Sequence, residues 1–280
     1  MQKLTEDLFL SVKFTLPYTH DKNTKDLEEN GRDIVSLAVR SIKKHIEKLR
    51  DNELYNALIF LAVNLESHPW NSRELVNHAT QLYNSIITKN LSESHFFSEN
   101  PGFCKMVNKW ITSYLKRDSW QNYAIIVVLY KWYCFHLTFP SVSDNLELLL
   151  VPSLLLVDSY DDELKEAGVR CLCHIISESG KTELRWHGRA QVIFDALHKL
   201  TYTHHQPLVA VLHPGILKIL DVLEGDPAAA AVSMKYFTFI CCSLHNLCSN
   251  VESSYCVWAG NSLFFLVFFN IFRVGVPNSG

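Results

Sequence analysis

The chain has 280 residues, of which 48% are hydrophobic and 20% are charged, and its formal net charge is −3. This composition is rich enough in apolar residues to exclude a disordered chain, and ten glycines and nine prolines are too few for collagen-like or low-complexity sequence. The nearly balanced charge excludes a strongly basic surface, so we expect neither nucleic acid nor an anionic membrane as a partner.

The cysteines and the N-terminal residues indicate a reducing compartment. Six of the eight cysteines lie in the second half, without regular spacing, in a chain far longer than disulfide-stapled secreted domains. Glu6 and Asp7 stand where a signal peptide has basic and then apolar residues. The apolar runs at 124–130, 148–157 and 263–272 are shorter than the roughly 20 residues that a membrane-spanning helix needs. We therefore expect a cytoplasmic or nuclear protein that does not span a membrane.

Apolar residues recur at helical spacing throughout the first half of the chain. One stripe follows Gly31, and the cap-type pair Asp51-Asn52 separates it from the next, which favours an antiparallel helix pair. Pro69 and Pro101 are placed to open two further helices. The predicted helices of this half cover residues 35–49, 54–65, 69–89, 101–114 and 118–137. Residues 17–33 are polar and charged, and we expect residues 1–30 to pack poorly.

The clearest repeat unit runs from about residue 146 to 178. An apolar helix containing a proline is followed by an acidic turn, and a second helix then carries a basic residue and a glycine. We expect the proline to kink the first helix, an aspartate to cap the second, and the glycine to permit close helix packing. This layout is typical of a HEAT repeat. The residues to which we assign these structural roles are Pro152, Asp158, Asp161, Lys165 and Gly168.

Three more stripes follow this unit, at 186–200, 207–222 and 226–247. The first is predicted to place Trp186 on a buried face together with Ala190. Helices of about fifteen residues with short connections favour an all-α, HEAT-like α-solenoid of antiparallel helix pairs.

The predicted domain boundaries follow from where this helical pattern starts and stops. We expect a poorly packed segment over 1–30, the repeat domain over 31–258, and a tail over 259–280. The run 261–272 has no helical stripe and no caps, so we expect the tail to be non-native or disordered. A C-terminally truncated or alternatively spliced chain would account for it.

No motif for catalysis or cofactor binding is present. The sequence lacks a glycine-rich phosphate loop, a GxSxG elbow and an HExxH pair. Cys241, His245 and Cys248 share one helical face, but two leucines share much of it, and a small-residue core stripe is the stronger interpretation. We predict no enzyme activity and no cofactor; a zinc-dependent hydrolase built on these three residues is the less favoured alternative.

Residues 148–223 resemble a known family. The resemblance is carried by LLLVPSLLLVDSYD at 148–161, by Lys165-Glu-Ala-Gly168, and by Glu183-Leu-Arg-Trp-His-Gly-Arg189. In this order they are similar to the Tel-two-interacting protein two family, the Tti-two subunit of the Triple T complex.

The resemblance implies a helical scaffold that binds the Tti-one subunit and, through it, Tel-two. Such an assembly acts with Hsp90 and its R2TP adaptor to mature and stabilise phosphatidylinositol-3-kinase-related kinases. His187 and Arg189 are candidates for partner contact, although an ion pair within the repeat is the stronger expectation for Arg189. A HEAT-type adaptor of another pathway is the alternative binding function.

Overall fold

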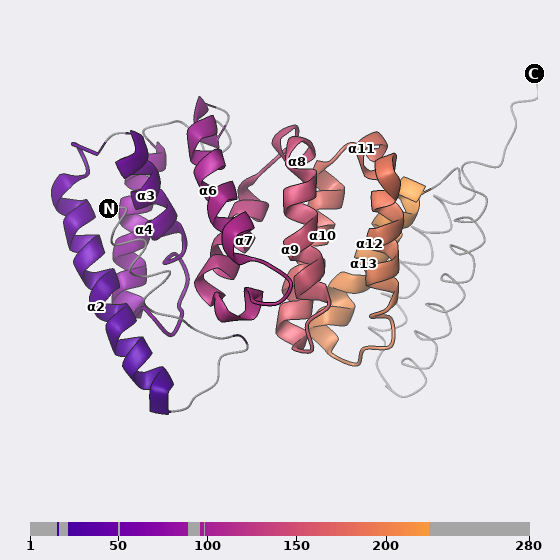
Figure 1. Cartoon of the computed structure of the whole chain (residues 1–280), viewed down its shortest axis with the longest axis horizontal. Coiled ribbons are helices and arrows are strands. Elements are labelled where there is room, and N and C mark those ends of the chain that lie inside the picture. Colours follow the sequence, from indigo (N-terminus) through magenta and orange to yellow (C-terminus); the bar gives the residue numbers. More distant parts are fainter. Residues whose placement is uncertain (1–15, 17–21, 50, 89–95, 98, 224–280) are drawn as a thin grey trace, which may run out of the picture. The chain divides into compact units, whose positions relative to one another are not determined.

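A computed structural model describes residues 16, 22–49, 51–88, 96–97 and 99–223 (Figure 1). Every regular element in these ranges is a helix, and none of the described residues lies in a strand. The chain divides into a unit of residues Met1–Val222 and a second unit, Leu223–Gly280. The described residues form the first unit, with only Leu223 beyond it, and the description below concerns that unit alone. The all-α class predicted from the sequence is confirmed.

The first three helices in the described part of the chain differ in length from the predicted apolar stripes. They are α2 (Lys22–His45), α3 (Asp51–Ala62) and α4 (Arg73–Ile87), and both α2 and α3 pack against α4. Helix α2 starts before the predicted boundary at residue 30 and ends before the predicted end at residue 49. Gly31 is buried where a Cβ atom would come within 2.6 Å of the Trp70 Cβ atom, so α2 approaches the following segment closely there.

The prediction that Pro69 opens a helix is wrong. Helix α4 begins at Arg73, where the Ser72 hydroxyl accepts a hydrogen bond of 3.4 Å from the Leu75 amide. Before it, the buried side chain of Asn71 donates to the Asn64 side chain at 3.1 Å and accepts from the His68 amide at 2.9 Å. These side-chain bonds hold an irregular turn where Pro69 had suggested the first turn of a helix.

The central helices are α6 (Pro101–Tyr114) and α7 (Ala124–His136), which pack against each other. Pro101 lies in the first turn of α6, as predicted. The prediction of one helix over 118–137 is wrong at its start, because the short helix η3 (Trp120–Asn122) precedes α7. The following residues of α7 are buried: Ala124, Ile125, Ile126, Val127, Val128, Leu129, Tyr130, Trp132, Tyr133 and Cys134.

The remaining helices continue the array in chain order. They are α8 (Ser141–Asp144), α9 (Leu146–Val157), α10 (Asp162–Glu178), α11 (Lys181–Arg185), η4 (Trp186–Gly188), α12 (Arg189–His198) and α13 (Gln206–Leu223). Helix α9 packs most extensively on α10, α12 packs on α9, and α10 also contacts α7. Successive helices therefore pack against near neighbours in the chain, which is the arrangement of an α-solenoid (Figure 1).

Helix α13 is, among the described helices, the one that is long and apolar enough to cross a membrane. A core helix of a soluble protein passes the same test, so this observation is weak evidence for a membrane. Leu208, Leu212, Ile216 and Ile219 are fully buried within the unit. The helix predicted over 226–247 and the tail predicted over 259–280 lie outside the described residues.

Candidate functional site

Helices α9 and α10, with the turn between them, contain the five residues to which the sequence assigned structural roles. Pro152 lies inside α9 and is buried. Gly168 lies inside α10 at the closest approach of the two helices, where an added Cβ atom would come within 2.7 Å of the Val157 nitrogen and 2.9 Å of the Ser153 oxygen. Gly168 therefore lies in the contact between α9 and α10, and α10 has no room there for a larger side chain.

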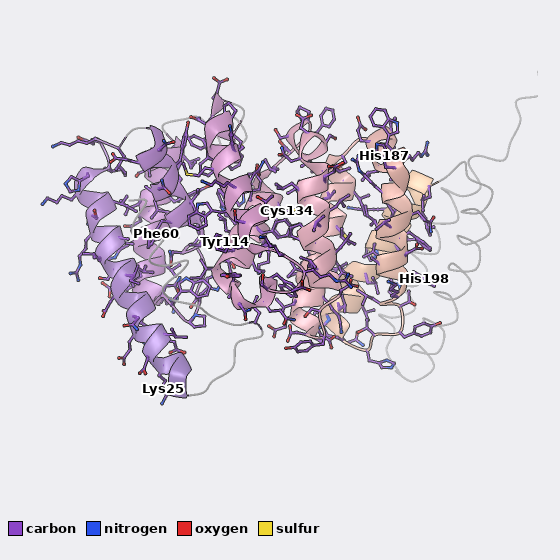
Figure 2. All side chains as sticks on the ribbon, in the orientation of Figure 1. Lys25, Phe60, Tyr114, Cys134, His187 and His198 are labelled. Atoms are coloured by element: carbon purple, nitrogen blue, oxygen red, sulfur yellow. The ribbon has the colours of Figure 1, made fainter. Side chains whose placement is uncertain are left out.

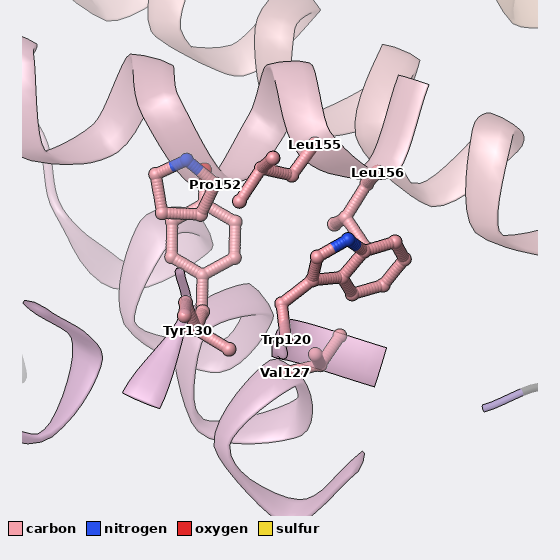
Figure 3. A pocket seen from close by; sticks show the side chains of 7 residues that line it. Trp120, Val127, Tyr130, Pro152, Leu155 and Leu156 are labelled. Atoms are coloured by element: carbon pink, nitrogen blue, oxygen red, sulfur yellow. The ribbon is translucent and has the colours of Figure 1, made fainter. Parts of the chain in front are cut away.

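Pro152 borders a shallow apolar hollow between α7 and α9 (Figure 3). Figure 3 shows its ring beside the ring of Tyr130, with Trp120 across the hollow. The Tyr130 hydroxyl donates to the Leu149 carbonyl at 2.7 Å and also hydrogen-bonds the hydroxyl of Ser153, which is fully buried. Burial raises the pKa of Tyr130, so its hydroxyl stays protonated. The Tyr130 hydroxyl is thus a hydrogen-bond partner for the buried Leu149 carbonyl and Ser153 hydroxyl, in the helical turn that contains Pro152.

The acidic turn between α9 and α10 has its aspartates at the helix ends. Asp158 follows the last residue of α9, and its amide donates to the Leu154 carbonyl at 3.0 Å. Asp161 precedes the first residue of α10, and its carboxylate accepts from the Leu164 amide at 2.9 Å. The Lys165 ammonium lies 2.8 Å from the Asp162 carboxylate, and this contact lowers the pKa of that exposed carboxyl. These contacts are local to the turn.

We expect Asp161→Ala to lower the free energy of unfolding by about 1 kcal/mol, because it removes the acceptor for an amide at the start of α10. Asp161→Asn is the matched control, since its side-chain oxygen can accept the same bond and should retain most of the stability. Urea unfolding followed by circular dichroism measures both. Equal losses for alanine and asparagine would show that the side-chain bond to Leu164 does not stabilise the helix.

His187 lies in the segment that joins α11 to α12, and Arg189 is the first residue of α12. Arg189 donates to the Glu147 carboxylate of α9 at 2.9 Å and to the Glu183 carbonyl at 3.3 Å. His187 is exposed and has a left-handed backbone, with φ 56 and ψ 21. The structure therefore places Arg189 in an ion pair between two helices and leaves His187 at the surface.

The prediction that Trp186 lies on a buried helical face is wrong. Its side chain is 60% exposed, whereas Ala190, predicted for the same face, is buried. The break at His187 and Gly188 rotates Trp186 away from the α12 stripe, since both residues have positive φ. The sequence signal for this break was the glycine one residue before the helix.

Three cysteines of this unit are held in their less reactive form. Burial raises the pKa of Cys104 and of Cys173. The pKa of Cys171 is raised first by a hydrogen bond with Cys134 and then by burial. A nucleophilic thiolate requires the opposite shift, so these three thiols are not activated for attack.

Within the described ranges, no group of three or more His, Cys, Asp or Glu side chains is arranged to hold a metal ion. The alternative zinc site at Cys241, His245 and Cys248 lies outside the described residues.

Comparisons with known proteins find matches in three mammals, and the matching proteins share one name. The chain is 27% identical to "TELO2-interacting protein 2" of Rattus norvegicus over 172 residues, which cover 59% of this chain and 34% of the rat protein. The protein of that name from Mus musculus matches with the same identity and the same coverage. The protein of that name from Homo sapiens is 33% identical over 110 residues, which cover 39% of this chain and 22% of the human protein.

No family model matches the chain, and no solved structure matches it. The matched part spans about a third or less of the length of the relatives, as the coverages of 34% and 22% show. The same name is nevertheless found in all three mammals, and it is the name of the family that residues 148–223 resemble. These matches confirm the resemblance predicted from the sequence: the chain is similar, over part of its length, to the TELO2-interacting protein 2 of three mammals.

Proposed function

We propose that this chain is a non-catalytic scaffold subunit of the Triple T cochaperone complex, in which it binds the Tti-one and Tel-two subunits. The observation that carries the proposal is the match to three proteins whose shared name states an interaction with TELO2. The solenoid supports it, because packed helix pairs present long surfaces suited to binding other proteins.

In this role the chain supports the maturation and stability of phosphatidylinositol-3-kinase-related kinases, acting with Hsp90 and its R2TP adaptor. The proposed location is the cytoplasm, with a further pool in the nucleus. The chain contributes surface and geometry, and the chemistry of the pathway belongs to Hsp90 and the client kinases.

Co-expression of the full chain with Tti-one, and separately with Tel-two, tests the proposal. An affinity tag on this chain should capture Tti-one in a 1:1 complex that stays together in size-exclusion chromatography. Tel-two should be captured efficiently only when Tti-one is also present. The matched control is an unrelated HEAT solenoid carrying the same tag.

Failure to capture either subunit by a folded chain would contradict the proposal and favour a HEAT-type adaptor of another pathway. Metal analysis of the same preparation tests the enzyme alternative separately. Stoichiometric zinc would favour the site at Cys241, His245 and Cys248.

A further inference from the structure

We propose that Trp186, His187 and Gly188 form an exposed finger whose indole inserts into an apolar pocket of a protein partner. We call these three residues the Trp186 finger. The inference rests on the proposed function, since it assigns to the binding subunit one anchor residue on its surface.

The exposure of the indole is the first observation. Trp186 is 60% exposed. Of the other tryptophans that the structure describes, Trp70, Trp120 and Trp132 are buried and Trp110 is half-buried. The finger lies in the connection between α11 and α12, where Figure 2 labels His187. Tryptophan is the residue type most enriched among side chains that dominate binding energy, because a large flat ring can fill a pocket with little loss of conformational freedom.

The backbone of the finger is the second observation. His187 has φ 56 and Gly188 has φ 68, so two consecutive residues are left-handed. His187 is the one residue other than glycine with positive φ in the described part of the chain. A left-handed residue with a side chain is unfavourable, and such residues are concentrated where a fold holds a functional group in place.

Contacts on both sides fix the ends of the finger. On one side Leu184 is fully buried, and the Arg185 Nε atom donates to the Val222 carbonyl of α13 at 2.6 Å. On the other side Arg189 is bound to Glu147 of α9 at 2.9 Å. The indole is therefore presented by a short turn tied to α9 and α13, which reduces the conformational entropy lost when a partner binds.

The neighbours of the indole indicate the chemistry of the pocket. Arg185 and His187 flank Trp186 in the sequence, and both are exposed. Arginine beside an aromatic anchor is typical of the centre of protein interfaces, where it meets carboxylates at the edge of the pocket. We therefore assign to the partner an apolar pocket edged with carboxylates.

Trp186→Ala in the full chain, co-expressed with Tti-one, tests the finger. We expect at least about tenfold weaker binding, measured as the dissociation constant by biolayer interferometry, with an unchanged melting temperature because the ring is exposed. Trp186→Phe should recover part of the affinity. Tyr160→Ala is the matched control, since Tyr160 is 70% exposed in the turn between α9 and α10, and this variant should bind like the wild type.

Charge variants at His187 test the carboxylate edge. His187→Glu should weaken binding at least several-fold more than His187→Lys, and the difference should shrink at high salt. Equal effects of the two substitutions would overturn the assignment of carboxylates to the pocket.

The outcomes separate the finger from the proposed function. If the wild type and Trp186→Ala capture Tti-one equally, the proposed binding role of the Trp186 finger is contradicted, and the proposed scaffold function is unaffected. If the folded wild type captures nothing, the scaffold function is overturned and the finger with it. A wild-type dimer that Trp186→Ala converts to a monomer, with Tti-one binding unchanged, would identify a second copy as the occupant and overturn the proposed partner.

Discussion

Replacing Gly168 with alanine is expected to lower the free energy of unfolding by about 3 kcal/mol. A Cβ atom at this position would come within 2.7 Å of the Val157 nitrogen, 2.9 Å of the Leu156 Cβ atom and 2.9 Å of the Ser153 oxygen. Two of these are backbone atoms of α9, which cannot move aside as the end of a flexible side chain can. Relief of the clash would require α9 and α10 to separate along the most extensive helix contact in the unit.

The sign of this effect is itself informative. In the middle of an ordinary helix, glycine to alanine stabilises by roughly 1 kcal/mol, because alanine loses less backbone entropy on folding. A net loss at Gly168 can therefore arise only if the packing term exceeds this gain. Gly102→Ala in α6 is the matched control, since its closest atom would be the Tyr55 ring carbon at 3.2 Å, which belongs to a side chain that can shift.

Urea unfolding of the two variants against the wild type gives the measurement. Gly102→Ala should stay within about 0.5 kcal/mol of the wild type, and Gly168→Ala should lose several times that amount. A Gly168→Ala variant as stable as the wild type would mean that α9 and α10 lie farther apart than described here.

The helix pair of α9 and α10 was predictable because its determinants are local. Apolar residues at helical spacing, a turn of aspartates and a glycine at a fixed offset can all be read within thirty-three residues, 146–178. The all-α solenoid follows from repetition of such local patterns along the chain. The assignment of His187 and Arg189 to partner contact stays a prediction, since the structure contains no partner.

The errors occurred where side-chain hydrogen bonds or left-handed residues interrupt the helical pattern. Pro69 suggested a helix start, but the bonds between Asn71, Asn64 and His68 hold a turn until Ser72. Trp186 matched the α12 stripe in spacing, but the left-handed residues after it place it on the surface. Periodicity reports which face a residue would have if the helix continued, and it contains no information on whether the helix continues.

The second large effect expected is a loss of stability on acidification that depends on His68. Burial, and secondarily the charge of Lys131, lowers the pKa of His68 to about 4 from the value of 6.5 that it has when exposed. Its ring stacks on Trp70 with the centroids 4.6 Å apart. The buried Nε2 atom has no hydrogen-bond partner among the described residues, so a proton placed there would have no acceptor.

The direction follows from proton binding in the two states. Between pH 6.5 and about 4 the unfolded chain binds a proton at His68 and the folded chain does not. Stability is therefore complete above pH 6.5 and declines as the pH falls toward the folded-state pKa. From pH 7 to pH 4 we expect this residue to account for a loss of roughly 3 kcal/mol, since each unit of pKa shift corresponds to about 1.4 kcal/mol.

Comparison of the wild type with His68→Phe isolates this contribution. Phenylalanine retains a flat ring beside Trp70 and cannot titrate, so the variant should lose less stability between pH 7 and pH 4. His213, whose pKa burial also lowers, is present in both proteins and cancels in the difference. His45→Gln replaces an exposed histidine and should follow the wild-type curve. If His68→Phe and the wild type lost stability in parallel down to pH 4, the folded protein would admit a proton at His68, and the ring would have to reach water or a carboxylate.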